Sequence, residues 1–210
     1  VGLVIGSVLF LFRFALAAPG VPIPLAAILI VTLSMIMTRG FHLDGLADTM
    51  DALLSHRTPE EKLAIMKDPH QGTFGVVAIV LDILLKTFLV MTLLTYPVYV
   101  AALVLHPLWG RLSTTVVTSV STYARPSGGL GRDMVECSGA GEFAIGLLTA
   151  AAVSALFGIT ALLCCVFAAL LGFLLGLVWR LALGGVTGDL LGSTTEISEI
   201  CSLMFFVMIV

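Results

Sequence analysis

The chain has 210 residues, of which 59% are hydrophobic and 11% are charged, and its formal net charge is −3. Soluble domains carry about 25% charged residues, so this composition excludes an ordinary soluble domain. The small net charge and the lack of a basic run give no sign of nucleic-acid binding. The surplus of apolar side chains predicts an all-α membrane protein, organised as one domain over residues 1–210.

Seven apolar runs are candidates for membrane-spanning helices, each of which needs about 20 mostly apolar residues. They occupy residues 1–18, 22–39, 74–95, 97–122, 142–158, 160–180 and 190–210. The last run opens with acidic residues, so we expect a polytopic bundle of about six or seven spans. Short turns are expected at Pro19-Gly20, Pro97 and near Gly158. Because Val1 already lies in an apolar run, we expect a native N-terminal stretch to precede it.

Two polar segments, residues 39–73 and 123–141, interrupt the apolar runs. Within the first, Thr58 is expected to cap a short helix that has Pro59 at its first position and Glu61 as its capping-box partner.

The basic residues of the loops predict the orientation in the membrane. They are Arg39, Arg57, Lys62, Lys67, Arg125, Arg132 and Arg180. With the spans above, all of them fall on one side, which the positive-inside rule makes cytoplasmic. We therefore expect a multi-pass protein of the cytoplasmic (inner) membrane, whose polar segments form one site that faces the cytoplasm.

The segment GFHLDGLADTMD, residues 40–51, places Asp44, Asp48 and Asp51 directly behind an apolar run. Steps of four and three residues bring the three carboxylates onto one face of a helix. A hard divalent cation such as Mg²⁺ relieves the repulsion between them and shares its ligands with substrate phosphate. The alternative is a solvated acidic face that complements the helix dipole. The apolar residues between the aspartates favour the metal site.

A second acidic group lies in GGVTGDLLGSTTEISE, residues 184–199, on the same side of the membrane. Asp189 and Glu196 are seven residues apart and share one helical face, and Glu199 follows. The preceding glycines allow backbone amides to approach a phosphate, or simply allow membrane helices to pack closely. Asp189 is either a site residue or only a helix cap.

Three arginines are candidate partners for phosphate, which a guanidinium binds through parallel hydrogen bonds. Arg125 and Arg132 flank the segment PSGGLG, where charges that only set topology are the alternative. Arg111 lies inside an apolar run, so it requires a structural or functional partner. Lys86 follows Asp82 by four residues within a span, a spacing that predicts an intrahelical ion pair.

His42 precedes the acidic segment and His70 follows Asp68. Each is a candidate base or phosphate contact, or else a hydrogen-bonded bystander. From the residues alone, we therefore predict a membrane-embedded, metal-dependent site for a phosphorylated substrate, compatible with phosphotransfer.

The stretch RGFHLDGLADTMDALLS, residues 39–55, resembles the signature of the cobalamin 5′-phosphate synthase family, the adenosylcobinamide-GDP ribazoletransferases. The resemblance continues, in the family's order, through MKDPHQGTFG (66–75), Arg111, YARPSGGLG (123–131) and GGVTGDLLGSTTEISEI (184–200). One departure is Ala52, which stands where the family pattern has a glycine.

This resemblance implies a magnesium-dependent membrane enzyme that acts late in the nucleotide-loop assembly of cobalamin (vitamin B12). The ribose 3′-hydroxyl of α-ribazole, or of its 5′-phosphate, attacks the phosphate attached to cobinamide in adenosylcobinamide-GDP. GMP leaves, and adenosylcobalamin or its 5′-phosphate forms. These small molecules and the lipid bilayer are the expected partners, with a homo-oligomer or other cobalamin-pathway enzymes as further options.

The resemblance also implies roles for the candidate residues. The metal ligands would be Asp44, Asp48 and Asp51, which would hold Mg²⁺ against the diphosphate. The catalytic candidates are Asp68 as base, with His42 or His70 as alternatives. The substrate-binding candidates are Arg111, Arg125, Arg132, Asp189 and Glu196.

Two other functions compete with this interpretation. A CDP-alcohol phosphotransferase is disfavoured because the chain reads ALLSHR after Asp51 and lacks that family's Asp-x-x-Asp-Gly-x-x-Ala-Arg pattern. A cation transporter is disfavoured because the acidic clusters lie at the ends of spans, and Asp82 alone is clearly at membrane depth.

Overall fold

The computed structural model describes residues 1–96, 100–126, 128–129 and 131–210. Within these ranges the chain forms ten helices, and its β structure is one isolated bridge between Tyr123 and Val186. The helices are α1 (Gly2–Ala17), α2 (Ile23–Met37), α3 (Phe41–Leu54), α4 (Pro59–Ile65), α5 (Thr73–Thr95), α6 (Ala101–Val120), α7 (Arg132–Glu136), α8 (Ala140–Leu156), α9 (Ile159–Leu183) and α10 (Gly188–Ile209). The all-α prediction is confirmed.

Each of the seven apolar runs forms a helix, and the corresponding helices are α1, α2, α5, α6, α8, α9 and α10. Gly158, whose φ is 100°, separates α8 from α9 as expected. The acidic residues at the start of the last run do not shorten its helix, because α10 continues to Ile209. The expected turn at Pro97 lies outside the described residues.

In the described part of the chain, three helices are long and apolar enough to cross a membrane on their own: α5, α9 and α10. Together, α2 and α3 also reach this length and composition, but they are bent by 88° at the break between them. Helices α1 and α8 are apolar but shorter. These features agree with a helical membrane bundle, and the number of six or seven spans stays a prediction.

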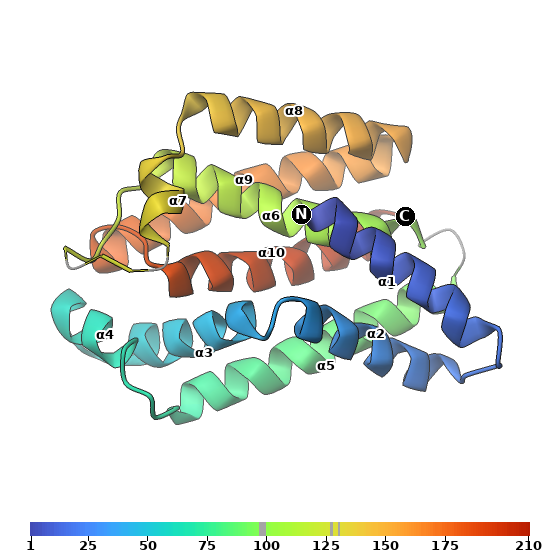
Figure 1. Cartoon of the computed structure of the whole chain (residues 1–210), viewed down its shortest axis with the longest axis horizontal. Coiled ribbons are helices and arrows are strands. Elements are labelled where there is room, and N and C mark those ends of the chain that lie inside the picture. The colour runs from blue at the N-terminus through green and yellow to red at the C-terminus, as the bar shows by residue number, and fades with distance from the viewer. Residues whose placement is uncertain (97–99, 127, 130) are drawn as a thin grey trace.

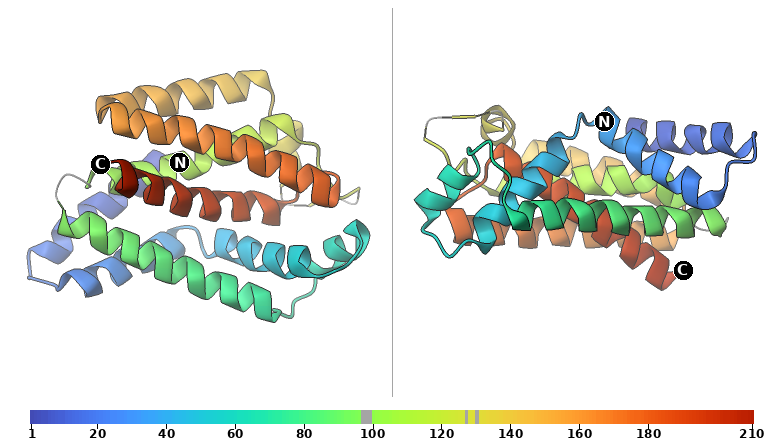
Figure 2. Two further views of the ribbon diagram at one scale, coloured as in Figure 1. Left: turned by 180° about the vertical axis from the view of Figure 1, so that it is seen from behind. Right: turned by 90° about the horizontal axis from the view of Figure 1, so that it is seen from below.

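Helix α10 lies in the middle of the bundle, between α6 and α9 on one side and α3 and α5 on the other (Figure 1, Figure 2). It is buried along most of its length, whereas α5 and α9 keep many apolar side chains exposed, as lipid-facing helices do. The main hydrophobic core includes Trp109 of α6 and Phe206 of α10, whose rings lie 6.0 Å apart.

The break between α2 and α3 is built by two consecutive left-handed residues, Arg39 (φ 54°) and Gly40 (φ 70°). The Gly40 N–H donates to the Met35 carbonyl at 3.0 Å, which closes the end of α2. The acidic segment therefore begins a new helix in a new direction. The predicted capping box of α4 is confirmed, since Thr58 and Glu61 each bond the other's backbone N–H.

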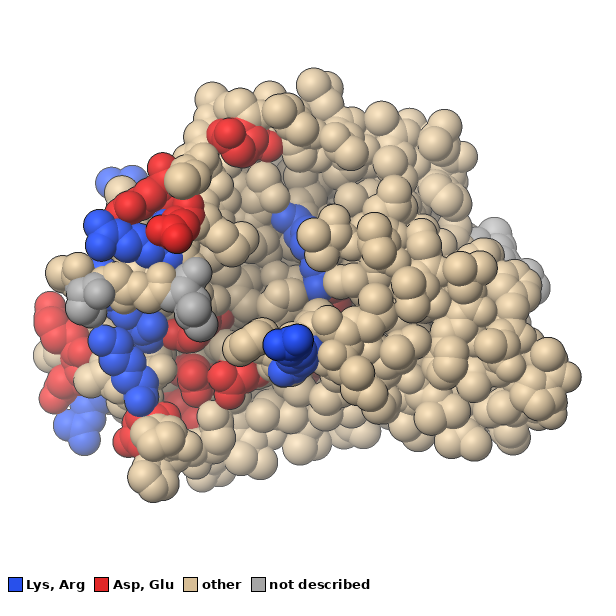
Figure 3. Space-filling model, viewed as in Figure 1, with Lys and Arg blue, Asp and Glu red and all other residues tan. Residues whose placement is uncertain are grey.

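The charged side chains gather at one end of the molecule, where α4 and α7 lie, and the opposite end is almost bare of charge in this view (Figure 3). The two polar segments therefore share one end of the bundle, as the sequence predicted. Which side of the membrane this end faces stays a prediction.

Candidate active site

The acidic face of α3 meets the start of α10 at a backbone contact. A Cβ atom added to Gly45 would lie 2.6 Å from the Asp189 carbonyl oxygen, so only glycine allows the two helices to approach this closely. Asp44, Asp51 and Asp189 all lie close enough to Asp48 to act on its charge. Acidic residues from distant parts of the sequence therefore converge, with Asp48 among them.

A pocket of about 420 Å³ opens beside this crossing. Its lining includes His42 and Asp44 of α3, Asp189 of α10, and the side chains of Thr114 and Thr195. The two threonine hydroxyls are 2.7 Å apart and bond each other across α6 and α10. The pocket thus brings together two predicted carboxylates, one predicted histidine and two hydroxyls that sequence reasoning missed.

Asp51 has a structural role, because it bonds the backbone at the start of α5. Its two carboxylate oxygens accept hydrogen bonds from the backbone N–H groups of Gly72 and Gly75, at 2.7 and 2.8 Å. These donors belong to the unpaired N–H groups at the start of α5, where a negative charge also complements the helix dipole. Asp51 therefore fastens the first turn of α5 to α3.

Asp51→Ala is expected to destabilise the protein by about 1–3 kcal/mol, because two partly buried N–H groups lose their acceptor. Thermal unfolding of the detergent-solubilised protein in EDTA measures this effect without any contribution from a metal. Asp133→Ala, at an exposed position of α7, is the matched control. Equal melting temperatures for the two variants would show that the Asp51 contacts do not stabilise the fold.

Arg125 reaches the same site from the loop between α6 and α7. Its Nη2 donates to Asp189 Oδ2 at 2.8 Å, and its buried Nε has no hydrogen-bond partner among the residues that the structure describes. The loop is held in place because the Ala124 N–H donates to the Val186 carbonyl at 2.8 Å, and the Val186 N–H donates to Thr122. A buried guanidinium with a spare donor beside a pocket is suited to binding an anion.

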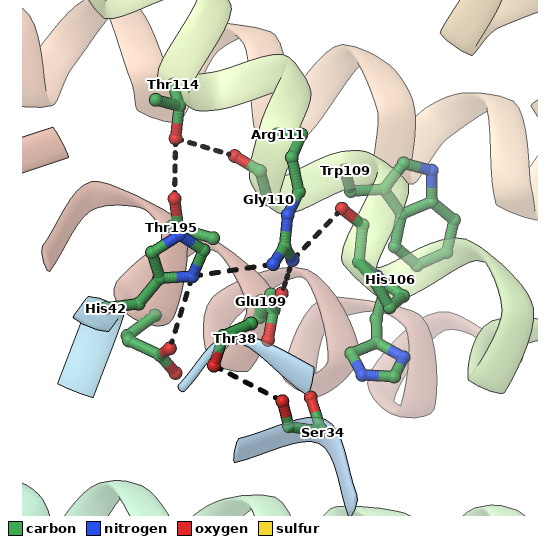
Figure 4. A network of polar contacts seen from close by, with 12 residues as sticks. Ser34, Thr38, His42, His106, Trp109, Gly110, Arg111, Thr114, Thr195 and Glu199 are labelled. Carbon is green, nitrogen blue, oxygen red and sulfur yellow. Dashed lines mark hydrogen bonds and ion pairs between the residues drawn. The ribbon is translucent and has the colours of Figure 1, made fainter. Parts of the chain in front are cut away.

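A network of buried charges adjoins His42 of the pocket lining, and Figure 4 shows the part of it around Arg111 and Glu199. Lys86 of α5 has its Nζ in contact with Glu196, 3.0 Å from Glu199 and 3.7 Å from Asp82. The predicted pair of Lys86 with Asp82 is present, but the two glutamates of α10 are the closer partners. Glu196, a predicted substrate-binding residue, is buried and contacts this lysine, and its role toward substrate stays a prediction.

Arg111 has the partner that its place in an apolar run required. Its Nη1 contacts Glu199 Oε1, and its Nη2 lies 3.4 Å from Nδ1 of His42 (Figure 4). His42 Nδ1 is also 3.7 Å from Glu196 Oε1. The buried network therefore reaches the pocket wall through Arg111 and His42.

Eight of the eleven predicted site residues lie outside the pocket lining, and three of these eight are also exposed. Asp68 and His70 are exposed and bond each other, with Nδ1 of His70 2.7 Å from Oδ1 of Asp68. Hydrogen bonds from the His70 backbone N–H and ring lower the pKa of Asp68, which weakens it as a base. Arg132 is exposed and donates through Nε to Glu136 at 2.7 Å.

Among the residues that the structure describes, no three His, Cys, Asp or Glu side chains already surround one common metal position. The donor chemistry still fits a hard divalent cation, because Asp44, Asp48 and Asp189 offer only oxygen. Mg²⁺ commonly takes one or two protein carboxylates and completes its shell with water and phosphate. Asp51, whose oxygens both accept backbone N–H groups, is the least available of the three predicted ligands.

Sequence reasoning missed several residues of this region. Gln71 donates to Asp48 at 3.2 Å. It lies within residues 66–75, a segment that the sequence analysis named without giving Gln71 a role. Thr114 follows Arg111 by three residues, and Thr195 precedes Glu199 by four. A position one helical turn from a charged site residue is the only local signal that these residues carry.

An apolar helical bundle whose charged end carries a pocket lined by Asp44 and Asp189, with Arg125 bonded to Asp189, has the features of a membrane-embedded enzyme. The model of the family described as Cobalamin-5-phosphate synthase matches residues 1–207. The chain therefore belongs to this family and is a transferase of cobalamin biosynthesis, as the resemblance predicted.

Several relatives carry the name adenosylcobinamide-GDP ribazoletransferase. The protein of Clostridium acetobutylicum is 32% identical over 205 residues, which cover 97% of this chain and 81% of that protein. That of Thermoanaerobacter sp. is 35% identical over 215 residues, covering 100% and 84%. That of Thiobacillus denitrificans is 41% identical over 170 residues, covering 80% and 66%. No solved structure matches the chain.

Proposed function

We propose that this protein joins α-ribazole, or its 5′-phosphate, to adenosylcobinamide-GDP and releases GMP. The observation that supports this most strongly is that Asp44 and Asp189 line one pocket, with Asp48 close enough to act on their charge and Arg125 bonded to Asp189, in a chain of this family. Carboxylates that can hold a metal and arginines that can bind phosphate are what transfer at a diphosphate requires.

In the reaction, the ribose 3′-hydroxyl oxygen forms a bond to the phosphorus attached to cobinamide. The bond from that phosphorus to the bridging oxygen breaks, GMP leaves with the electron pair, and the hydroxyl proton passes to a carboxylate. Arg125 and Arg111 hold phosphate oxygens and reduce the repulsion between these oxygens and the carboxylates. Asp44, Asp48 and Asp189 would hold Mg²⁺, which would supply positive charge that offsets the negative charge of the diphosphate.

We also propose that the protein is a multi-pass component of the cytoplasmic (inner) membrane, with the charged end facing the cytoplasm. The gathering of lysine and arginine at the end that carries the pocket supports this orientation (Figure 3). Its partners would be the two small-molecule substrates and the surrounding lipid. A homo-oligomer, or contact with other enzymes of the pathway, remains an expectation from the family resemblance.

The test uses the full chain purified in detergent and supplied with Mg²⁺, adenosylcobinamide-GDP and α-ribazole. GMP release that requires both substrates is the expected result, and a reaction without α-ribazole is the control. Failure to release GMP, together with CMP release from a CDP-linked lipid and an alcohol, would instead establish a CDP-alcohol phosphotransferase. Cation flux in liposomes without GMP release would establish a transporter.

A further inference from the structure

The buried charged network contains more carboxylates than its cations require. Lys86 and Arg111 face Asp82, Glu196 and Glu199. If Glu199 were neutral, the two remaining carboxylates would still balance the two cations. Burying a carboxylate that is not needed to neutralise the two cations is costly. Charge neutralisation therefore does not explain why Glu199 is buried here.

Glu199 uses its two oxygens for two different cations. Oε1 contacts Nη1 of Arg111, and Oε2 lies 3.0 Å from Nζ of Lys86. The side chain of Glu199 is only 3% exposed, so water does not compete for either contact. Glu199 therefore links the two cations: Lys86 holds its Oε2 atom, and its Oε1 atom holds the Arg111 guanidinium.

The guanidinium of Arg111 has contacts on two sides, one facing the buried network and one facing His42 of the pocket lining. Nη1, which contacts Glu199, also lies 3.4 Å from the Pro107 carbonyl oxygen. Nη2 points to His42, which lines the pocket (Figure 4). A change of the Arg111 rotamer would break the contacts of Nη1 with Glu199 and with the Pro107 carbonyl. These two contacts therefore determine where Nη2 lies.

The backbone is shaped to permit this arrangement. A Cβ atom added to Gly110 would lie 2.7 Å from Cγ of Glu199 and 3.1 Å from the Thr195 carbonyl oxygen. Gly110 precedes Arg111 on α6, so the absence of a side chain there lets Glu199 of α10 reach the guanidinium.

We propose that Glu199 is a positioning residue, which together with Lys86 holds the Arg111 guanidinium toward the pocket so that it binds an anionic phosphate group of the substrate. This inference rests on the proposed function. Glu199 itself does not touch substrate, because it lies beneath Arg111. Its effect on the reaction passes entirely through the orientation of that arginine.

The test is a double-mutant cycle of Glu199→Gln, Arg111→Gln and the double variant, measured as GMP release at varied substrate concentrations. Glu199→Gln is expected to raise KM for the GDP-linked substrate about 10-fold, because a displaced guanidinium loses its phosphate contact. KM for α-ribazole is expected to stay at the wild-type value. In the double variant, Glu199→Gln has no further effect, because the residue it positions is absent.

Two further variants separate positioning from charge and from folding. Glu199→Asp keeps a negative charge beside Lys86 but is one methylene too short to hold Arg111, so we expect it to raise KM as Glu199→Gln does. Asp82→Asn removes a carboxylate from the same lysine without touching Arg111, and its KM should equal that of the wild type. Wild-type behaviour of Glu199→Asp, additive effects in the cycle, or an equal defect in Asp82→Asn would each overturn the inference.

A measurement without turnover distinguishes this inference from the proposed function. Inorganic diphosphate with Mg²⁺ should raise the melting temperature of the wild type and of Asp82→Asn, but not of Glu199→Gln or Arg111→Gln. If the wild type releases no GMP yet shows this pattern, the proposed function fails and the positioning role stands. If diphosphate stabilises none of these proteins, or all of them equally, the positioning role fails.

Discussion

Asp48→Asn is expected to lower the rate of GMP release on the order of 10²- to 10³-fold, as removal of one group that stabilises charge in a transition state does. The reason is its place among Asp44, Asp51 and Asp189, all of which act on its charge. The asparagine side chain has the same size, and its carbonyl oxygen can still accept the hydrogen bond from Gln71. We therefore expect a folded protein that lacks one negative charge at the proposed metal site.

The measurement is GMP release at saturating substrates while Mg²⁺ is titrated. In the wild type, EDTA should stop the reaction and added Mg²⁺ should restore it, whereas Asp48→Asn should remain slow at every concentration. Glu60→Gln, in the exposed first turn of α4, is the control and should keep the wild-type rate. A rate for Asp48→Asn within about threefold of the wild type would contradict the metal proposal.

Gly45→Ala is expected to reduce both stability and activity, because it changes the contact that assembles the site. The new methyl group would lie 2.6 Å from the carbonyl oxygen and 2.9 Å from the Cα atom of Asp189. These are backbone atoms and cannot turn aside, so α3 must move away from α10. We expect a loss of about 1–3 kcal/mol in stability and, since Asp44 and Asp48 move with α3, a fall in rate on the order of 10²-fold.

Thermal unfolding and GMP release of the same preparation measure the two effects together. Gly141→Ala is the matched control, because a Cβ atom there meets nothing within 4 Å and the position is exposed on α8. That variant should unfold and react as the wild type does. If Gly45→Ala also behaved as the wild type, the close approach of α3 and α10 would not be needed to build the site.

The local features of this protein could be predicted from its sequence because their causes are local. Each apolar run became a helix, since lipid offers no partner to backbone N–H and C=O groups and a helix pairs them within the run itself. Thr58 and Glu61 form their capping box because both residues lie within one helical turn. The carboxylates of Asp44, Asp48 and Asp51 lie on one helix because their spacing is short and regular.

The roles of the same charged residues could not be predicted, because each role depends on a partner far away in the chain. Asp51 bonds the start of α5, 21 and 24 residues later. Lys86 was assigned to Asp82 by spacing, but Glu196, 110 residues away, is a closer partner. The spacing rule identifies neighbours on one helix and carries no information about the helix packed against it.

The sequence by itself thus determined a helical membrane protein, its family, and the acidic and arginine-containing segments that supply its site. Only the tertiary structure decided which of these residues meet at the pocket and which hold the bundle together. The physical reason is that a carboxylate in a crowded interior takes the nearest cation or N–H group. Which group is nearest follows from the crossing of α3, α6 and α10 at Gly45 and Gly110.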